Sequence, residues 1–228
     1  MDILVLSFDH GLYVNLGPAV RSRRARMVDV EDIKKIVEAA TGITTPTNGE
    51  LDGLLRDAKA SAFHFKDDGF IPNHPLWPLL LYPACVRLPK GRDPAAIFEA
   101  LFARNDWGRS WRNGAYDFVH YHSRTHEVLA VARGWVRLQL GGPKGRILPT
   151  KAGDVAILPA GTGHQRLAAS DNFLAVGAYP PGGAYDEYKN VERHTRAKIT
   201  IRKTARLKRD PIYGAESPLL KHWKKRAA

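Results

Sequence analysis

The sequence predicts an all-β fold, a single barrel or sandwich of short strands in the middle of the chain. Between Gly114 and Tyr179, short runs of apolar and β-branched residues alternate with Gly and Pro, a pattern typical of closely spaced strands joined by turns. No internal repeat is visible, so we expect one barrel and not two. The expected strands lie near residues 115–122, 126–133, 135–140, 154–158, 164–168 and 173–179.

Two further elements are expected before these strands. Residues 79–86 are a strand candidate that Pro83 interrupts. Asp93 and Pro94 are typical of the first turn of a helix, which we expect to run to about Asn105. The apolar residues at helical spacing in this segment predict its buried face: Ile97, Phe98, Leu101 and Phe102.

The two ends of the chain differ from the middle in composition. Residues 1–60 contain a helical spacing of Ile33, Ile36 and Val37 and predict a small helical N-terminal extension. Residues 193–228 carry 12 Lys and Arg against 2 Asp and Glu, which makes a basic tail. In this tail we expect one more strand at 199–201 and a packed end at 219–223. The predicted domains are therefore the extension (1–60), the barrel (61–192) and the tail (193–228).

The composition argues against several classes of protein. The single cysteine, Cys85, cannot form an internal disulfide and fits a reducing compartment. No window approaches the ~20 apolar residues of a membrane span, so we expect a cytoplasmic protein without a membrane partner. The net charge of +12 lies mainly in the tail, whose aromatic residues are Tyr213 and Trp223 alone. The sequence thus argues against nucleic acid as the partner.

Two segments of the predicted barrel combine glycines with potential metal ligands. The first segment runs Gly114, five residues, His120-Tyr121-His122, four residues, Glu127, six residues, Gly134. The second runs Gly153, five residues, Pro159-Ala160-Gly161, two residues, His164. In residue type and spacing, both resemble the two signature motifs of the cupin superfamily. That resemblance implies a double-stranded β-helix, or jelly-roll, barrel that binds one metal ion.

A closer resemblance spans roughly residues 63–223. The runs His120 to Ser123, His126 to Leu129, Leu158 to Gln165, Gly177 to Gly182 and Asp210 to Gly214 are similar to YjlB-type bacterial cupins. The resemblance implies a small metal-binding cupin but supplies no agreed substrate. Residues 1–60 fall outside it.

Strand geometry supports the metal site independently. Side chains two apart in a strand lie on one face about 6.6 Å apart, so His120 and His122 can converge on one ion. The return strand can bring Glu127 beside them, and the Pro-x-Gly turn delivers His164. Three imidazoles and one carboxylate suit a single divalent Fe, Mn, Ni or Zn ion and leave two positions open in octahedral coordination.

The other histidines are not expected to be ligands. His126 should face away from the ion by strand alternation, either at the surface or behind the ligands. The remaining five have no partnering pattern and are expected at the surface: His10, His64, His74, His194 and His222.

Three further residues are candidates for the chemistry. Tyr116, on the inner face with His120, and Tyr179 are possible proton-transfer groups. Arg166 lies two residues beyond His164, so alternation aims it into the same cavity. There it can bind a carboxylate or phosphate of the ligand; the alternatives are an arginine that reaches the barrel mouth or one that is paired internally.

We therefore expect a metal-dependent enzyme, of the oxygenase or isomerase type, that acts on a small polar molecule with an anionic group. The alternative is a cupin that binds or senses a small ligand without catalysis, because the fold hosts both. We also expect a homodimer, with association through the outer face of one sheet or through exchanged strands.

Overall fold

The computed structural model describes residues 4–8, 11–15, 46–57, 59–189 and 194–224. The chain divides into two compact units, Met1–Thr44 and Thr45–Ala228. In the first, β1 (Leu4–Phe8) pairs antiparallel with β2 (Gly11–Asn15). This part of the extension is thus a pair of strands and not helical, since both runs are short and rich in apolar residues. The helix expected near residues 30–39 lies outside the described residues.

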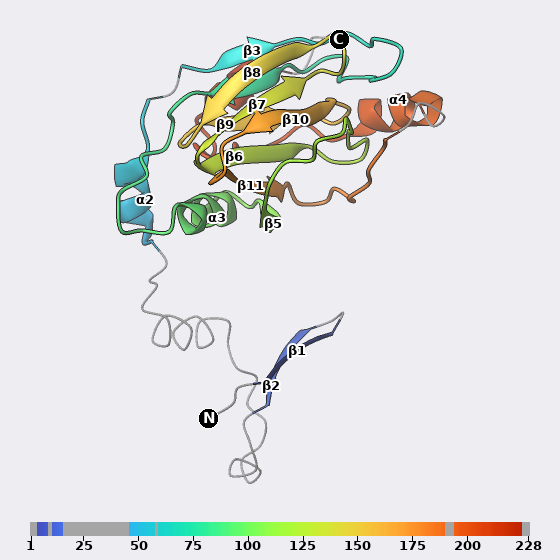
Figure 1. The fold of residues 1–228 in the computed structure, drawn as a ribbon. Helices are drawn as coiled ribbons and strands as arrows, with labels where there is room; N and C mark the ends of the chain where they lie inside the picture. Colours follow the sequence, from blue (N-terminus) through green and yellow to red (C-terminus); the bar gives the residue numbers. More distant parts are fainter. Residues whose placement is uncertain (1–3, 9–10, 16–45, 58, 190–193, 225–228) are drawn as a thin grey trace. The chain divides into compact units, whose positions relative to one another are not determined.

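The second unit confirms the predicted all-β jelly roll, with two antiparallel sheets (Figure 1). The larger sheet has the order β3-β4-β9-β6-β11-β5 and the smaller one β10-β7-β8. The larger sheet contains β3 (Ser61–Phe63), β4 (Leu79–Tyr82), β9 (Val155–Leu158), β6 (Glu127–Arg133), β11 (Leu174–Tyr179) and β5 (Gly108–Asn113). The smaller sheet contains β10 (His164–Ala169), β7 (Trp135–Leu140) and β8 (Arg146–Lys151).

The inner core lies between the two sheets. Leu129 and Val131 of β6 point inward with Glu127, as strand alternation predicts, and pack with Val136 and Leu138 of β7. Their neighbours Val128 and Ala130 point the other way into a second core. Strand β6 is therefore buried on both faces, which explains its nearly continuous apolar sequence.

Helices and the C-terminal segment cover the outer face of the larger sheet. Helix α3 (Pro94–Arg104) packs on β5, β6 and β11, capped by Asp93, which accepts from Ala95 N at 3.0 Å. Its four predicted core residues are all buried. Helix α2 (Asn48–Leu54) begins with a Thr47–Glu50 capping box and buries Leu51 in the same core. Residues 46–57, assigned by composition to the extension, thus belong to the barrel unit.

The tail differs from expectation in one element. Residues 199–201, expected as a strand, lie in helix α4 (His194–Lys203). Ala197 and Ile201, four residues apart, are buried together, whereas Ile199 is 55% exposed. Burial therefore follows the spacing of a helix and not the alternating Ile-Thr-Ile pattern that predicted a strand. The predicted packed end is confirmed: α5 (Pro218–His222) leads to Trp223, which is fully buried.

The strands of the barrel unit differ from the sequence prediction at five places. Strand 115–122 is wrong over most of its length, because β5 ends at Asn113 and residues 117–118 form a bend; only His120 and Tyr121 make isolated bridges. The strand expected at 79–86 ends at Tyr82 and lies inside the larger sheet, between β3 and β9. Strands β3, β5 and β8 were not predicted; in β8, Pro149 and the charged ends disguise the pattern. Among the described residues, no helix has the length and apolar character needed to span a membrane.

Candidate metal centre

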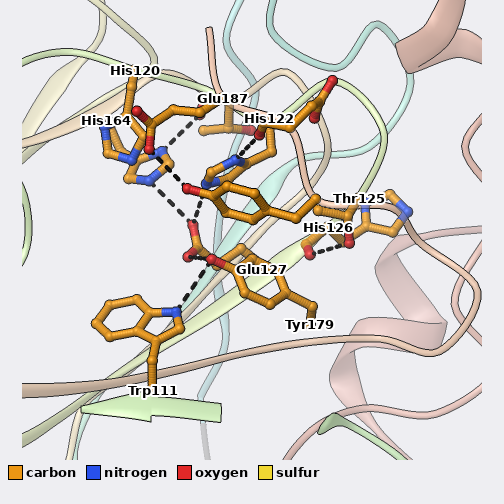
Figure 2. Close-up of polar contacts among 12 residues, drawn as sticks. Trp111, His120, His122, Thr125, His126, Glu127, His164, Tyr179 and Glu187 are labelled. Atoms are coloured by element: carbon orange, nitrogen blue, oxygen red, sulfur yellow. Dashed lines mark hydrogen bonds and ion pairs between the residues drawn. The ribbon is translucent and has the colours of Figure 1, made fainter. Parts of the chain in front are cut away.

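Three buried histidines converge at one end of the inner core. His120 and His164 form an antiparallel bridge, with backbone N–H···O distances of 3.2 and 2.9 Å, and His122 follows two residues after His120. The three side chains offer ligand atoms that all lie within 4.8 Å of one another. Figure 2 shows the three rings with Glu127 below them. The sequence-predicted ligands are therefore brought together.

Backbone carbonyls orient each of the three imidazole rings. The Nδ1 atoms of His120 and His164 lie 3.3 and 3.0 Å from the carbonyl oxygens of Phe118 and Thr162, and Nδ1 of His122 contacts that of Asp186. A carbonyl oxygen only accepts hydrogen bonds, so each Nδ1 carries the hydrogen. Each Nε2 is left with a free lone pair, the form in which imidazole binds a metal.

Burial also keeps His120 in the ligand form. Desolvation, together with the neighbouring His164 and His122, lowers the pKa of His120 to about 3. The ring is therefore neutral at physiological pH and available for coordination.

Glu127 begins β6 and directs one carboxylate oxygen at the histidines. Its Oε2 lies 3.1 Å from Nε2 of His164 and 3.5 Å from Nε2 of His122. Burial alone would raise the pKa of this carboxyl, but His122 and His164 in their protonated form would outweigh burial and lower the pKa. An ion bound to the Nε2 atoms would supply the same positive charge in place of those protons. Oε2 is buried without a hydrogen bond, which is unusual for an ionised oxygen unless a cation neutralises it.

These distances fit a shared metal ion. Two ligand atoms, each about 2.1 Å from an ion, are about 3.0 Å apart at a right angle and about 3.4 Å apart at the tetrahedral angle. The two contacts of Glu127 with His164 and His122 lie close to these values. The nitrogen and oxygen donors are those preferred by Fe, Mn, Ni and Zn.

Tyr179, predicted as a proton-transfer group, holds the other oxygen of Glu127. Its hydroxyl donates to Oε1 of Glu127 at 3.1 Å and accepts from Nε1 of Trp111 at 3.2 Å. Burial, followed by the negative charge of Glu127, raises the pKa of Tyr179, so the hydroxyl stays protonated. Tyr179 therefore orients the carboxylate.

A cavity of about 300 Å³ lies beside the four candidate ligands. Tyr116 lines it but is 45% exposed, with its ring 5.1 Å from that of His120, so it lies at the mouth. Tyr179 and Tyr185 also line it. The cavity is large enough for a small molecule.

Arg166 is half-buried and lies next to the cavity wall. Its Nη1 is 3.6 Å from the place that a Cβ on Gly114 would take, and Gly114 lines the cavity, although Arg166 itself does not. A bulge in the β10–β7 pairing follows at Arg166–Ala168 and interrupts the regular alternation. No ion pair of its guanidinium occurs in the described part of the chain, so its anion-binding role stays a prediction.

His126 faces away from the centre, as predicted, but is buried. Its Nδ1 accepts from Ala160 N at 2.9 Å and its Nε2 donates to Ala205 O at 2.9 Å. It thereby ties the strand of Glu127 to the turn that precedes His164.

His74, expected at the surface, is also buried and stacks on Trp77, with ring centroids 4.3 Å apart. That prediction was wrong: its Nδ1 accepts from two backbone N–H groups, at Leu76 and Trp77, which offsets part of the cost of burial, while its Nε2 is buried without a hydrogen bond.

Sequence reasoning missed three residues around the centre. Trp111 bonds Tyr179, Tyr185 packs on His122 with ring centroids 4.9 Å apart, and Asp186 binds the chain just after His122. They lie outside the two motifs, and the Pro-Pro-Gly-Gly run before Tyr185 was the available signal that the chain turns back there.

Comparison with known proteins gives one strong match. The chain is 39% identical over 171 residues to the uncharacterized protein YjlB of Bacillus subtilis (strain 168), which covers 74% of this chain and 99% of that protein. No protein-family model matches the chain.

Solved structures resemble the chain only weakly. A mutant of Bacillus subtilis oxalate decarboxylase is 18% identical with a TM-score of 0.29, covering 50% of this chain and 24% of that one. Acireductone dioxygenase from Bacillus anthracis, with a cadmium ion in its active centre, is 14% identical with a TM-score of 0.30, covering 43% and 71%. Procruciferin, the 11S globulin of Brassica napus, is 19% identical with a TM-score of 0.26, covering 36% and 20%. The chain thus spans about a quarter or less of the first and third structures, and scores this low support no conclusion about activity.

Proposed function

The chain belongs to the YjlB family of cupins, and from this membership and the geometry of its buried centre we propose that it is a metal-dependent enzyme acting on a small polar molecule. The proposed ligands are His120, His122, Glu127 and His164. The observation that carries the proposal is the convergence of three Nε2 lone pairs and one carboxylate oxygen beside a cavity of about 300 Å³.

His120, His122, Glu127 and His164 line the cavity, so an ion that they held would be within reach of a substrate there. A divalent ion would supply Lewis acidity or a site for dioxygen, which corresponds to isomerase or oxygenase chemistry. Burial of all four side chains excludes water from the ligand side of the centre. The chain's own residues then bind and orient the substrate: Tyr116 and Tyr185 are the aromatic groups at the mouth.

A specific observation favours a second candidate, a cupin that binds or senses its ligand without catalysis. The hydroxyl of Tyr179, the buried tyrosine of the cavity, is already bonded to Glu127 and Trp111. A group held in this way serves the ligand geometry better than it serves proton transfer to a substrate.

Metal identity is the measurement that tests the proposal. Protein purified without added metal should carry about one divalent transition metal per chain, measured by elemental analysis. Iron would favour the oxygenase type, whereas zinc or nickel would leave the isomerase and binding roles. Purified wild-type protein that neither carries nor takes up a stoichiometric metal would refute both candidates.

A further inference from the structure

A segment from outside the two cupin motifs lies against the metal centre. Residues 184–189, here called the strap, follow Gly183, where a Cβ would lie only 2.5 Å from Oγ1 of Thr125. Glycine is thus required for the chain to pass this close to the turn between His122 and Glu127. At its other end, Tyr188 pairs with Tyr121 through two backbone hydrogen bonds of 3.0 and 3.2 Å, and their rings stack.

Asp186 makes four contacts between the strap and the ligand-bearing turn. Its Oδ1 accepts from the backbone N–H groups of Ser123 and Arg124 at 2.8 and 3.1 Å, and its Oδ2 accepts from the Ser123 hydroxyl at 2.5 Å. Its carbonyl oxygen accepts from Nδ1 of His122. One residue therefore holds both the His122 ring and the turn directly behind it.

The neighbours of Asp186 lie near the mouth of the cavity. Tyr185 lines the cavity, and Nζ of Lys189 lies 5.8 Å from the ring centroid of Tyr116, which is at the mouth. Tyr185 packs on His122 and donates its hydroxyl hydrogen to Glu187 at 2.8 Å. Glu187 in turn pairs with Lys189 at 2.8 Å. The strap thereby carries a polar row across the entrance.

We propose that Asp186 is a positioning residue of the metal centre, which couples metal binding at His122 to the placement of the strap over the cavity mouth. The inference rests on the proposed metal site. A metal that binds Nε2 of His122 requires the hydrogen on Nδ1, and this hydrogen bonds the Asp186 carbonyl, so each event favours the other.

Zinc affinity of the full-length protein tests the coupling, measured by competition with a chromophoric chelator. Asp186→Ala keeps the carbonyl oxygen that bonds His122 but removes the three side-chain hydrogen bonds that hold this carbonyl in place. It should weaken zinc binding about 10- to 100-fold, the usual effect of disturbing a partner behind a metal ligand. Asp186→Asn keeps an oxygen for both backbone N–H groups and should recover most of the affinity. Asp171→Ala, which removes an exposed aspartate from a turn, is the matched control and should bind like wild type.

Hydrogen exchange supplies a readout independent of affinity. Zinc should slow amide exchange in residues 184–189 of the wild type but not of Asp186→Ala. If Asp186→Ala does not fold, Ser123→Ala takes its place, with about threefold weaker zinc binding expected from one lost hydrogen bond.

The coupling alone would be overturned if the folded Asp186→Ala or Ser123→Ala protein bound zinc as tightly as wild type. It would also be overturned if zinc did not change the exchange rate of the strap amides in the wild type. Wild-type protein that binds no zinc, cobalt or iron would instead overturn the metal site, and the coupling with it.

Discussion

Tyr179 donates its hydroxyl hydrogen to Oε1 of Glu127 over 3.1 Å, which leaves Oε2 as the oxygen that faces His122 and His164. A carboxylate has two equivalent oxygens and can rotate, so a fixed donor at one of them determines which oxygen meets the ion. Trp111 in turn fixes the hydroxyl of Tyr179 at 3.2 Å. The ligand geometry thus depends on β5 and β11 as well as on the motif strands.

Replacing Tyr179 with Phe should therefore weaken metal binding about tenfold, because Glu127 loses the bond that orients it. Chelator competition on the purified variant measures the change. Tyr213→Phe is the control, since it also removes a bonded hydroxyl, one that donates to Arg56 O. Equal affinities in the two variants would show that Tyr179 does not orient the ligand.

Mutation should distinguish the proposed ligands from the neighbouring His126, which is not expected to bind the metal. His120→Ala or His164→Ala should abolish stoichiometric metal, because each removes one of three converging nitrogens. His126→Ala should retain the metal and lower the free energy of unfolding by about 2 kcal/mol, since Ala160 N and Ala205 O lose their partner. Elemental analysis and denaturant unfolding measure the two effects; full metal retention in His120→Ala would refute the assignment.

The cluster of four candidate ligands was predictable because its members lie in two local patterns. His120 and His122 are two residues apart, Glu127 lies on the return strand, and the Pro-x-Gly turn places His164 across from His120. Strands β6, β7, β9, β10 and β11 followed from the same Gly and Pro punctuation, to within one or two residues. Local spacing thus determined both the ligands and the strands that carry them.

The surroundings of the ligands depend on contacts between distant segments. Asp186 is 63 residues from Ser123, and Trp111 is 68 from Tyr179, so no spacing rule connects them. The burial of His74 likewise depends on backbone donors and on stacking with Trp77, neither of which a pattern of apolar residues reports. Sequence reasoning identified the candidate ligands and missed the residues that surround them.

Stability should fall in mild acid because of His74. Burial, with a smaller effect from His126, lowers the pKa of His74 to about 3, against 6.5 in the unfolded chain. Between these values the unfolded state binds more protons, so stability is full above pH 6.5 and is lost as the pH falls. One such histidine lowers the free energy of unfolding by about 1.4 kcal/mol at pH 5.5.

His74→Asn provides the comparison, because its side-chain oxygen can accept the same two backbone N–H groups. The loss of unfolding free energy from pH 7.5 to 5.5, measured with urea, should be about 1 kcal/mol smaller in this variant than in wild type. His64→Asn, at an exposed position, should match wild type. An identical pH dependence in His74→Asn would contradict the prediction.

The outer face of the smaller sheet is the surface on which we expect a homodimer to form. Trp135, Ile147 and Leu167 lie on its strands, and each is more than 40% exposed. Residues 79–86 are the sequence's candidate for an exchanged strand, but β4 is already paired on both sides, which argues against exchange there. Light scattering of the full chain should give a dimer at micromolar concentration, and Trp135→Asp should give a monomer. A wild-type monomer would reject the dimer.

Arg166 should contribute to binding an anionic ligand without contributing to the metal. Its guanidinium is half-buried beside Gly114 and has no ion pair within the described residues, and a buried cation is costly unless it meets water or an anion. A charge-assisted pair is worth about 1.5 to 3 kcal/mol, or about ten- to a hundredfold in affinity.

Arg166→Leu should thus weaken binding of formate or phosphate to the cobalt-loaded protein by at least tenfold, as followed by the cobalt absorption spectrum. Arg166→Lys should recover only part of this affinity, because it keeps the charge but cannot make the bidentate contact of a guanidinium. Both variants should hold one cobalt per chain. Anion affinity that is the same in Arg166→Leu and wild type would remove Arg166 from the site and leave the metal centre as proposed.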